Sequence, residues 1–381
     1  MSGSNNLPGT PMMRVLLAAI EANIPVLLWG KPGIGKTATL TGMADSFGRH
    51  LEVIVGSVRD ATDYLGLPIE QDGQLVYSVP AWAHRLADAP KGLLFLDELT
   101  TCTKAVMAAQ LRLVQERWIG DAFQMPQTVS IVAAANPVDQ AVNGNELDPP
   151  TANRFLHLDW DLDQGMWLNN LATRFRHVTY PSLQQVVAAE SDAAYARVGG
   201  LVSAYLNANS ARISPNVPDT LGVGTDRGGY GPSWAYASPR SWTNLVDVIS
   251  RLQPGDEAAI QLAARGLVGL ADATPFIAWY RGAALYDPQE VVEGRVKVDW
   301  RNDSPDRLFA LNQSLVAMAR NSGSADLARR ILDLFTECAT QGRKDVVVPP
   351  LRTLLSGLPN QVRVPQALRD ALGDVVLRGA A

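Results

Sequence analysis

The sequence predicts an α/β domain with a parallel sheet, followed by a mostly helical region. Three observations lead to this fold class. The first half carries short, nearly continuous apolar runs, and such runs are typical of parallel strands buried on both faces. Between the third and fourth runs, Met107, Leu111, Val114 and Trp118 recur at helical spacing, as expected for alternating strands and helices. After Gly165 the strand pattern fades, so we expect domains at residues 1–177 and 178–381.

Five segments of the first half are candidate strands. Four of them are nearly continuous apolar runs, and the fifth, at 155–160, is a weaker candidate. In chain order the five segments are Pro25–Trp29, Leu51–Val55, Gly92–Leu96, Val129–Ala133 and Phe155–Trp160.

The second half reads as a series of amphipathic helices. Apolar residues recur there at helical intervals, with charged residues between them. A loop rich in Gly, Pro and Asp, at 214–237, interrupts the series. The helices are expected at 183–206, 241–252, 256–270, 306–320 and 326–340, with shorter ones near 351–355 and 366–377.

Composition excludes several classes of protein. The 381 residues include 33 Lys and Arg against 38 Asp and Glu, a net charge of −5, which argues against binding to nucleic acid through a basic surface. Cys102 and Cys338, the only cysteines, form no disulfide framework. The N-terminal apolar runs are broken by Glu21, Asn23 and Pro25, which fits neither a signal peptide nor a membrane span. We therefore expect a cytoplasmic protein without a membrane partner.

The strongest motif is the segment at 30–37, GKPGIGKT, which fits G-x-x-x-x-G-K-[ST] between a predicted strand and a predicted helix. Glycines allow backbone N–H groups to curl around phosphate oxygens, and the helix N-terminus adds its dipole. Lys36 would neutralise the β- and γ-phosphates, and the hydroxyl of Thr37 would bind Mg²⁺. The candidate nucleotide-binding residues are Gly30, Lys31, Pro32, Gly33, Ile34, Gly35, Lys36, Thr37 and Ala38.

A second motif ends the third predicted strand. Four apolar residues, 93–96, precede Asp97 and Glu98. This is the pattern of a Walker B strand, in which Asp97 would hold Mg²⁺ and Glu98 would polarise the attacking water. An ordinary strand ending in surface acids has the same appearance, but the position downstream of Lys36 favours the functional interpretation.

Three further polar residues are catalytic candidates. Asn136 follows the fourth predicted strand, where it could touch the γ-phosphate or the attacking water, although an Asn before Pro is also a common turn. Arg154 precedes the fifth strand and could reach the γ-phosphate of a neighbouring subunit; the alternative is a structural surface arginine. Arg240 follows Ser238 and Pro239, a helix start that would project it toward a phosphate rather than leave it simply solvated.

With these elements in order, residues 10–250 resemble an AAA+ ATPase, and more narrowly the MoxR branch, which is related to dynein-type AAA domains. The resemblance rests on GKPGIGKT, LLFLDEL, AAANP, NRF and ASPRSW. It implies a sheet in the order 5-1-4-3-2, a helical lid, Mg²⁺-dependent hydrolysis of ATP, and assembly into a ring, often a hexamer. By this resemblance Asn136 is sensor 1, Arg154 the arginine finger and Arg240 sensor 2.

Two insertions match the same branch. The segment at 63–82 contains Asp72-Gly73 between apolar residues, which predicts a hairpin tip, and it resembles the helix-2 insert that faces a ring pore or substrate. The segment at 117–127 resembles the hairpin before sensor 1. The tip of the first insert is polar and its best aromatic candidate is Tyr77, so remodelling of a docked partner is as compatible with it as threading of a polypeptide.

Three functions remain open from the sequence. The first is a chaperone-like ATPase ring that remodels or activates a protein partner, and the resemblance suggests a von Willebrand A-domain protein for this role. The second is a nucleic-acid-associated AAA+ motor, which the acidic balance disfavours. The third is a nucleotide-gated scaffold that hydrolyses ATP slowly.

Overall fold

The computed structural model describes residues 7–121, 123–136, 145–175, 178–213, 234–283, 286–357 and 362–373. Their contacts divide the chain into two compact units. Unit 1 comprises 1–188 and 215–273, and unit 2 comprises 189–214 and 274–381. Since unit 1 takes segments from both halves of the sequence, the expected domain boundary at residue 177 stays a prediction. Most of the loop expected at 214–237 lies outside the described residues.

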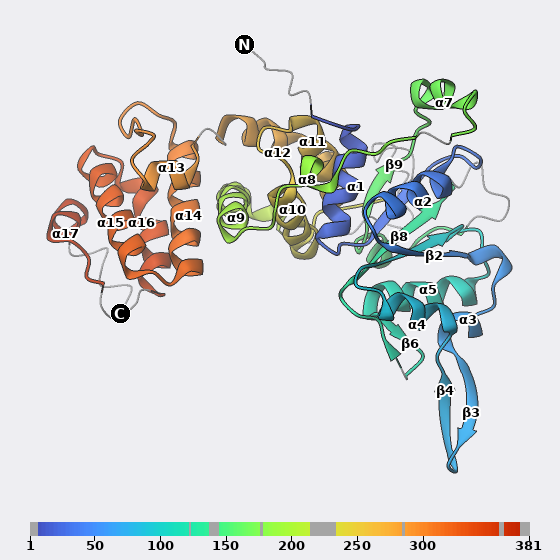
Figure 1. The fold of residues 1–381 in the computed structure, drawn as a ribbon. Coiled ribbons are helices and arrows are strands. Elements are labelled where there is room, and N and C mark those ends of the chain that lie inside the picture. The colour runs from blue at the N-terminus through green and yellow to red at the C-terminus, as the bar shows by residue number, and fades with distance from the viewer. Residues whose placement is uncertain are drawn as a thin grey trace. The chain divides into compact units, whose positions relative to one another are not determined.

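Unit 1 contains a five-stranded parallel sheet in the order β2-β5-β8-β1-β9 (Figure 1). Counted along the chain, this is the expected order 5-1-4-3-2, read from the opposite edge. In β1, which lies between β8 and β9, Trp29 pairs with Ala135 on one side and Asp159 on the other, so that the strands present their carboxyl ends at one edge. The strands are β1 (Val26–Trp29), β2 (His50–Val55), β5 (Gly92–Asp97), β8 (Val129–Ala135) and β9 (Leu156–Asp159).

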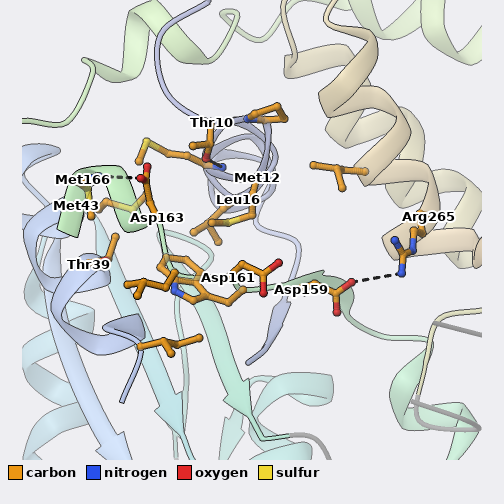
Figure 2. Close-up of a pocket in the computed structure, with 16 residues that line it drawn as sticks. Thr10, Met12, Leu16, Thr39, Met43, Asp159, Asp161, Asp163, Met166 and Arg265 are labelled. Atoms are coloured by element: carbon orange, nitrogen blue, oxygen red, sulfur yellow. Dashed lines mark hydrogen bonds and ion pairs between the residues drawn. The ribbon is translucent and has the colours of Figure 1, made fainter. Parts of the chain in front are cut away.

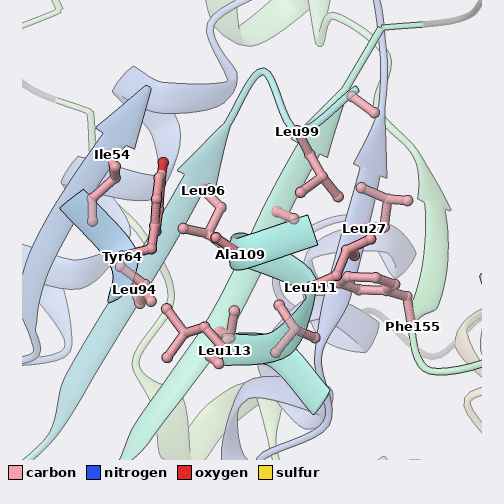
Figure 3. Packing of buried hydrophobic residues seen from close by; sticks show 14 of the residues in the cluster. Leu27, Ile54, Tyr64, Leu94, Leu96, Leu99, Ala109, Leu111, Leu113 and Phe155 are labelled. Atoms are coloured by element: carbon pink, nitrogen blue, oxygen red, sulfur yellow. The ribbon is translucent and has the colours of Figure 1, made fainter. Parts of the chain in front are cut away.

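Helices cover both faces of this sheet, which explains why its strands are mostly apolar. On one face, Leu27, Leu94 and Leu96 pack in a cluster that includes Leu113 of α5 (Figure 3). Figure 1 shows α4 and α5 on this side of the sheet and α2 on the other. The covering helices are α1 (Pro11–Glu21), α2 (Lys36–Ser46), α4 (Ala81–Asp88) and α5 (Lys104–Glu116).

Both expected insertions contain antiparallel hairpins. In the first, Asp72 and Gly73 form the tip with φ angles of 53° and 75°, and Gln71 pairs with Gln74 across it. This hairpin projects from the body of unit 1 (Figure 1), and Leu75 at its end is 70% exposed. The elements are α3 (Thr62–Leu65), β3 (Leu67–Gln71) and β4 (Gln74–Ser78) in the first insertion, and β6 (Trp118–Ile119) and β7 (Phe123–Gln124) in the second.

A buried ion pair joins α1 to the helical segment that returns to unit 1. The guanidinium of Arg14 donates two hydrogen bonds, of 2.5 and 2.8 Å, to the carboxylate of Asp256, which also caps α11 through the N–H of Ala259. This arrangement fixes α11 beside α1. The remaining helices of unit 1 are α6 (Pro149–Ala152), α7 (Gln164–Leu171), α8 (Leu183–Val186), α10 (Pro239–Arg251) and α11 (Glu257–Val268).

Unit 2 is helical. Its α14 packs closely on α9, because Gly200 of α9 has no side chain at the contact. A Cβ at Gly200 would lie 2.5 Å from Cα of Ser314, on α14. No helix in the described part of either unit is long and apolar enough to cross a membrane. The helices are α9 (Asp192–Ala208), α12 (Leu270–Ala283, which begins in unit 1), α13 (Pro288–Val292), α14 (Pro305–Ser322), α15 (Ala325–Thr340), α16 (Lys344–Leu355) and α17 (Gln366–Leu372).

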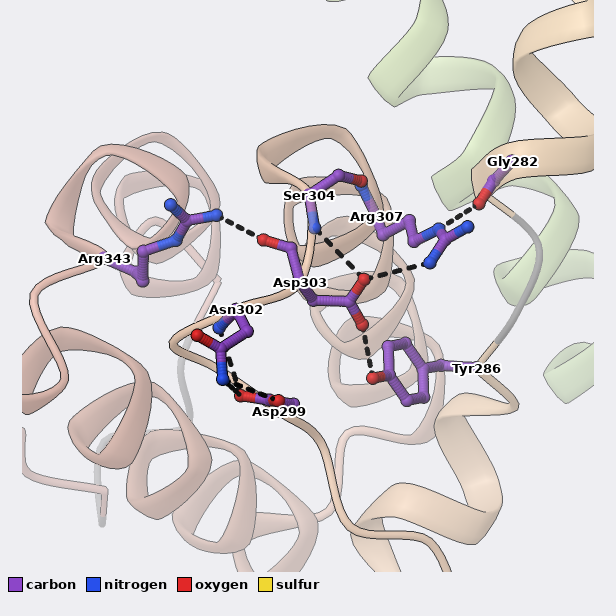
Figure 4. A network of polar contacts seen from close by, with 8 residues as sticks. All are labelled: Gly282, Tyr286, Asp299, Asn302, Asp303, Ser304, Arg307 and Arg343. Atoms are coloured by element: carbon purple, nitrogen blue, oxygen red, sulfur yellow. Dashed lines mark hydrogen bonds and ion pairs between the residues drawn. The ribbon is translucent and has the colours of Figure 1, made fainter.

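A polar network fixes the segment between α13 and α14 (Figure 4). The carboxylate of Asp303 accepts hydrogen bonds from Tyr286, from Arg307 and from the N–H of Ser304, while Arg343 donates to its backbone carbonyl at 2.6 Å. Burial alone would raise the pKa of Asp303, but the hydrogen bonds from Tyr286 and Arg307 outweigh it and lower that pKa. The network therefore has a structural role within unit 2.

Candidate nucleotide-binding site

The loop between β1 and α2 has the backbone that phosphate binding needs. Gly33 and Gly35 adopt left-handed φ angles of 78° and 84°, and at both positions the space that a Cβ would enter is open. Gly30 lies so close to Trp160 that a Cβ would approach the Trp160 carbonyl oxygen to 2.7 Å. Gly35 caps α2 without a side chain, so the first N–H groups of this helix remain available to an anion.

Lys36 occupies the centre of this loop. The residue is only 8% exposed. Its side-chain amine donates hydrogen bonds to the carbonyl oxygens of Gly30, at 2.7 Å, and Lys31, at 3.0 Å. Burial lowers the pKa of Lys36, while the charges of Asp97 and Glu98 oppose that shift. The amine is thus held in place by neutral carbonyl groups, which leaves its charge free to interact with phosphate oxygens.

Thr37 and Asp97 come together as expected. The Thr37 hydroxyl donates to Oδ2 of Asp97 at 2.8 Å, and Oδ1 of Asp97 accepts from the N–H of Glu98 at 2.9 Å. A hydroxyl and a carboxylate are the hard oxygen ligands that Mg²⁺ prefers. These two residues therefore fit a Mg²⁺ ion that accompanies a nucleotide.

Glu98 follows β5 in an unusual backbone conformation, with φ of 59°. Its carboxylate accepts a hydrogen bond from the hydroxyl of Ser57, in the short 3₁₀ helix Gly56–Val58 after β2. Left-handed geometry is costly for a residue other than glycine and is often retained at functional sites. Ser57 was missed from the sequence, although it is a polar residue just after a predicted strand, the same signal that identified Asn136.

Asn136 lies directly after β8, beside the loop. Its Oδ1 is 3.5 Å from the amine of Lys36. The structure thus brings Lys36, Thr37, Asp97, Glu98 and Asn136 to one edge of the sheet, at the carboxyl ends of β1, β5 and β8. Ligands of open α/β sheets bind at this edge.

A cavity of about 490 Å³ adjoins the loop (Figure 2). Apolar side chains of α1, α2 and the segment after β9 line it, among them Met12, Leu16, Ile34, Met43 and Trp160. Its size and lining are typical of a pocket for a small organic ligand. Ile34, one of the residues expected to bind nucleotide, faces this cavity. The sequence did not identify most of the other lining residues, because they come from distant segments that meet only in the folded chain.

Arg154 and Arg240 lie close enough to each other for their charges to interact. Arg154 donates to the carbonyl oxygen of Pro150 at 2.8 Å. Burial and the charge of Arg240 lower the pKa of Arg154. In the described part of the chain, neither arginine has a hydrogen bond or ion pair with Lys36, Thr37, Asp97 or Glu98. Their expected roles therefore stay predictions.

His157 is a buried core residue. Its Nδ1 accepts from Nε1 of Trp29 at 2.9 Å, so the ring is neutral when Nε2 donates to the carbonyl oxygen of Ala152 at 2.7 Å. Complete burial lowers the pKa of His157 to about 4. The residue anchors α6, which directly precedes the segment carrying Arg154.

Comparison with known proteins gives a match to one family model and distant similarity to curated proteins, among them the two described next. Residues 25–155 match the AAA domain of the dynein-related subfamily. Protein NorQ from Paracoccus denitrificans is 27% identical over 165 residues, which are 42% of this chain and 60% of NorQ. Midasin from Giardia intestinalis is 29% identical over 173 residues, which are 41% of this chain and 3% of midasin. The chain thus spans less than two thirds of either relative.

Solved structures give weaker likenesses. A protein from Cytophaga hutchinsonii, provisionally described as an ATPase, aligns with a TM-score of 0.42 and 19% identity over 76% of this chain and 88% of that one. A full-length MCM homolog from Methanopyrus kandleri aligns with a TM-score of 0.40 and 15% identity over 67% and 54% of the two chains. Both likenesses are too low to add to the fold defined by the strand order. The phosphate loop and four of the five strands of the sheet, β1, β2, β5 and β8, fall within the family match: residues 25–155 are an AAA domain of the dynein-related subfamily.

Proposed function

We propose that this protein is a Mg²⁺-dependent ATPase that works as a ring and remodels or activates a protein partner. The observation that supports hydrolysis best is the convergence of Lys36, Thr37, Asp97 and Glu98 beside the phosphate loop. A binding scaffold without chemistry would need Lys36 and Thr37, but it would not need a carboxylate such as Glu98 next to the Mg²⁺ ligand.

In this proposal the loop binds the polyphosphate through its backbone N–H groups and through Lys36. Thr37 and Asp97 hold Mg²⁺, which supplies positive charge at the phosphates. The base and ribose occupy the apolar cavity beside Ile34 and Trp160. Each of these contacts comes from a single subunit, so nucleotide binding does not require assembly.

Glu98 orients and polarises the attacking water, and Asn136 contacts the water or the γ-phosphate. For this to happen, Glu98 must leave the hydroxyl of Ser57, which it binds in this structure. Ser57 is therefore a positioning residue that holds Glu98 in a resting arrangement.

Arg154 and Arg240 act on the nucleotide of a neighbouring subunit. Two like charges near each other are unfavourable unless an anion meets them, and burial plus the charge of Arg240 lowers the pKa of Arg154. A contact between different faces of identical subunits is a head-to-tail interface, which closes into a ring. A hexamer is the ring size implied by the resemblance to MoxR proteins.

The partner is proposed to be a protein, with a von Willebrand A-domain protein as the specific candidate. The projecting β3–β4 hairpin supports a protein contact, since Leu67, Ile69 and Leu75 are each more than 40% exposed on it. The net charge of −5 disfavours the alternative, a nucleic-acid motor.

The function is tested first by ATP titration of Lys36→Ala, with Lys91→Ala as a matched control. Lys91 is a surface lysine of unit 1 that pairs with Glu21. We expect Lys36→Ala to lose measurable ATP binding and turnover, and Lys91→Ala to retain both. Unchanged ATP affinity in Lys36→Ala would contradict the assignment of the loop.

The partner class is tested with Glu98→Gln, expected to trap the ATP-bound ring. Material that co-purifies with this variant, but not with Lys36→Ala, is analysed for protein and for nucleic acid. Nuclease-resistant recovery of a discrete protein supports the proposal, whereas recovery that depends on nucleic acid supports the motor.

A further inference from the structure

The cavity beside the phosphate loop has a mostly apolar wall with a few polar side chains (Figure 2). In the proposed function this cavity takes the base and the ribose of the nucleotide. Apolar side chains suit the faces of a base, but a ribose carries two hydroxyl groups, and each needs a hydrogen-bond partner when it leaves water. The polar side chains of the wall therefore decide how the ribose is held.

The two threonines that line the cavity already have partners. Oγ1 of Thr10 accepts a hydrogen bond from the N–H of Met13 at 3.2 Å and so caps α1. The side chain of Thr39, on α2, is hydrogen-bonded to that of Tyr180. Both threonines thus contribute to the structure of the cavity wall.

Three carboxylates also line the cavity, and they differ in what they contact. Oδ2 of Asp159 lies 3.4 Å from Nη2 of Arg265. Oδ1 of Asp163 accepts from the N–H of Met166 at 2.8 Å, and Figure 2 marks both contacts with dashed lines. Asp161 is exposed and has no hydrogen bond or ion pair with any residue that the structure describes. Its two carboxylate oxygens are therefore available to a ligand.

Asp161 lies where the phosphate loop meets the cavity. It directly follows Trp160, whose N–H donates to the carbonyl oxygen of Trp29, at the end of β1, at 2.6 Å. The carbonyl oxygen of Trp160 is so close to Gly30, the first residue of the loop, that a Cβ there would approach it to 2.7 Å. In a nucleotide the ribose likewise joins the phosphates to the base. A nucleotide with its phosphates in the loop and its base in the cavity therefore brings its ribose toward Asp161.

A carboxylate at this place opposes nucleotide binding unless the nucleotide itself supplies hydrogen-bond donors. Asp161 and a triphosphate are both negatively charged, and like charges repel. The ribose offsets this repulsion, because its neighbouring hydroxyl groups present two O–H donors to the two oxygens of one carboxylate. In dinucleotide-binding α/β folds, an acidic residue binds the ribose 2′-hydroxyl in this way.

We propose that the carboxylate of Asp161 accepts hydrogen bonds from the 2′- and 3′-hydroxyl groups of the bound nucleotide, and that the site thereby selects ribonucleotides over 2′-deoxyribonucleotides. The inference rests on the proposed ATP binding. It makes Asp161 a specificity-determining residue for the sugar, while the loop around Lys36 binds the phosphates.

The experiment is calorimetric titration of the full chain with ATP and with 2′-deoxyATP, both in the presence of Mg²⁺. Removing a negative charge from the cavity favours both nucleotides equally, so the ratio of the two dissociation constants reports on the ribose contact alone. The unaltered protein should bind 2′-deoxyATP about tenfold more weakly than ATP. In Asp161→Ala this preference should fall below about twofold.

Two controls accompany this comparison. Asp163→Asn removes a carboxylate from the same cavity while keeping a residue that caps helices well, so its preference for ATP should stay near that of the unaltered protein. Tripolyphosphate has neither base nor ribose, and Asp161→Ala should bind it at least as tightly as the unaltered protein does. Weaker binding of tripolyphosphate would give Asp161 a structural role in the phosphate loop and overturn the proposal.

Equal affinity of the unaltered protein for ATP and 2′-deoxyATP would also overturn the proposal. Purine riboside triphosphate, which lacks the amino group of adenine, tests the other donor of the nucleotide. If Asp161→Ala abolishes the preference for ATP over this analogue and keeps the preference over 2′-deoxyATP, Asp161 binds the base and the proposal is wrong. If the unaltered protein binds no ATP, the proposed function itself fails; if it binds ATP but Asp161→Ala keeps the ribose preference, only this inference fails.

Discussion

Lys36 and Arg154 are both cations that the sequence nominates for phosphate, yet their surroundings differ. Lys36 is buried in a loop whose carbonyl oxygens fix its amine, beside the other residues of its site. The side chain of Arg154 donates a hydrogen bond to the carbonyl oxygen of Pro150, and its charge interacts with that of a second arginine, Arg240. In the proposed function, one subunit binds ATP by itself, while the two arginines act on the nucleotide of a neighbouring subunit. The comparison indicates a division between binding within a subunit and catalysis across two.

The largest effect that would sharpen this comparison is expected from Arg154→Ala. It should retain ATP affinity but lose about 10³–10⁵-fold in turnover, because the charge that develops at the phosphate is then uncompensated. Titration and steady-state phosphate release measure the two quantities. A comparable loss of affinity would place Arg154 in the binding site of its own subunit and break the comparison. Arg112→Ala, at a surface arginine paired with Glu116 and Asp121, is the matched control.

Glu98→Gln tests the other half of the comparison, the site around Lys36. The amide keeps the shape of the side chain but cannot polarise water, so turnover should fall by about 10²–10⁴-fold while ATP still binds. Single-turnover hydrolysis isolates this chemical step. Turnover near that of the unaltered protein would show that another group activates the water.

The sequence predicts which residues of the candidate site lie together when their positions after the strands bring them together, but not when only tertiary packing does so. The phosphate loop, Asp97, Glu98 and Asn136 each follow a buried strand, and parallel strands bring their carboxyl ends together, so their meeting follows from local pattern. The hydrogen bond of Ser57 with Glu98, and the charge interaction of Arg240 with Arg154, arise from tertiary packing and have no such pattern.

In the helical half of the chain, too, some elements could not be predicted from the sequence. The single helix predicted at 183–206 is in fact two, α8 and α9, because Ser191 caps a new helix at Asp192. The helix α12 was missed because Pro275 lies inside it, and proline normally signals a helix end. By contrast, the continuous apolar strands were all predicted, since burial on both faces leaves a strong signal.

A smaller effect is expected from Ser57→Ala. Without the Ser57 hydroxyl, the Glu98 carboxylate is free to meet water, so basal turnover should rise about threefold to tenfold, which corresponds to the loss of one ordinary hydrogen bond. Phosphate release at saturating ATP is the measurement, with Ser46→Ala as a control at an exposed serine. A fall in turnover would mean that Ser57 positions Glu98 for catalysis instead of restraining it.

A last effect, on stability rather than on activity, concerns His157, which supports the segment carrying Arg154. The pKa of His157 is lowered to about 4 in the folded chain. As the pH falls, the unfolded chain therefore binds a proton at this histidine near pH 6.5, whereas the folded chain does not bind it until about pH 4. The free energy of unfolding should therefore fall by about 3 kcal/mol as the pH drops from about 6.5 to about 4, and this contribution should level off below that pH.

Urea unfolding across this pH range measures the slope. His157→Gln should remove this part of the slope, because its amide can accept from Trp29 and donate to Ala152 without titrating. His84→Gln, at an exposed histidine, should leave the slope in place. An unchanged slope in His157→Gln would show that His157 is not the group responsible.

The central claim, that Arg154 completes the ATP site of a neighbouring subunit, is tested most directly by mixing two inactive variants. Arg154→Ala subunits have an intact phosphate loop but cannot supply an arginine finger to a neighbour. Lys36→Ala subunits cannot bind ATP in their own loop but can supply Arg154. Co-assembly is verified by affinity tags on different variants, and phosphate release is measured over a range of mixing ratios. Recovery of turnover in mixed assemblies, highest at intermediate ratios, is the predicted result. No recovery in assemblies shown to contain both variants would contradict action across subunits and leave Arg154 a structural surface arginine.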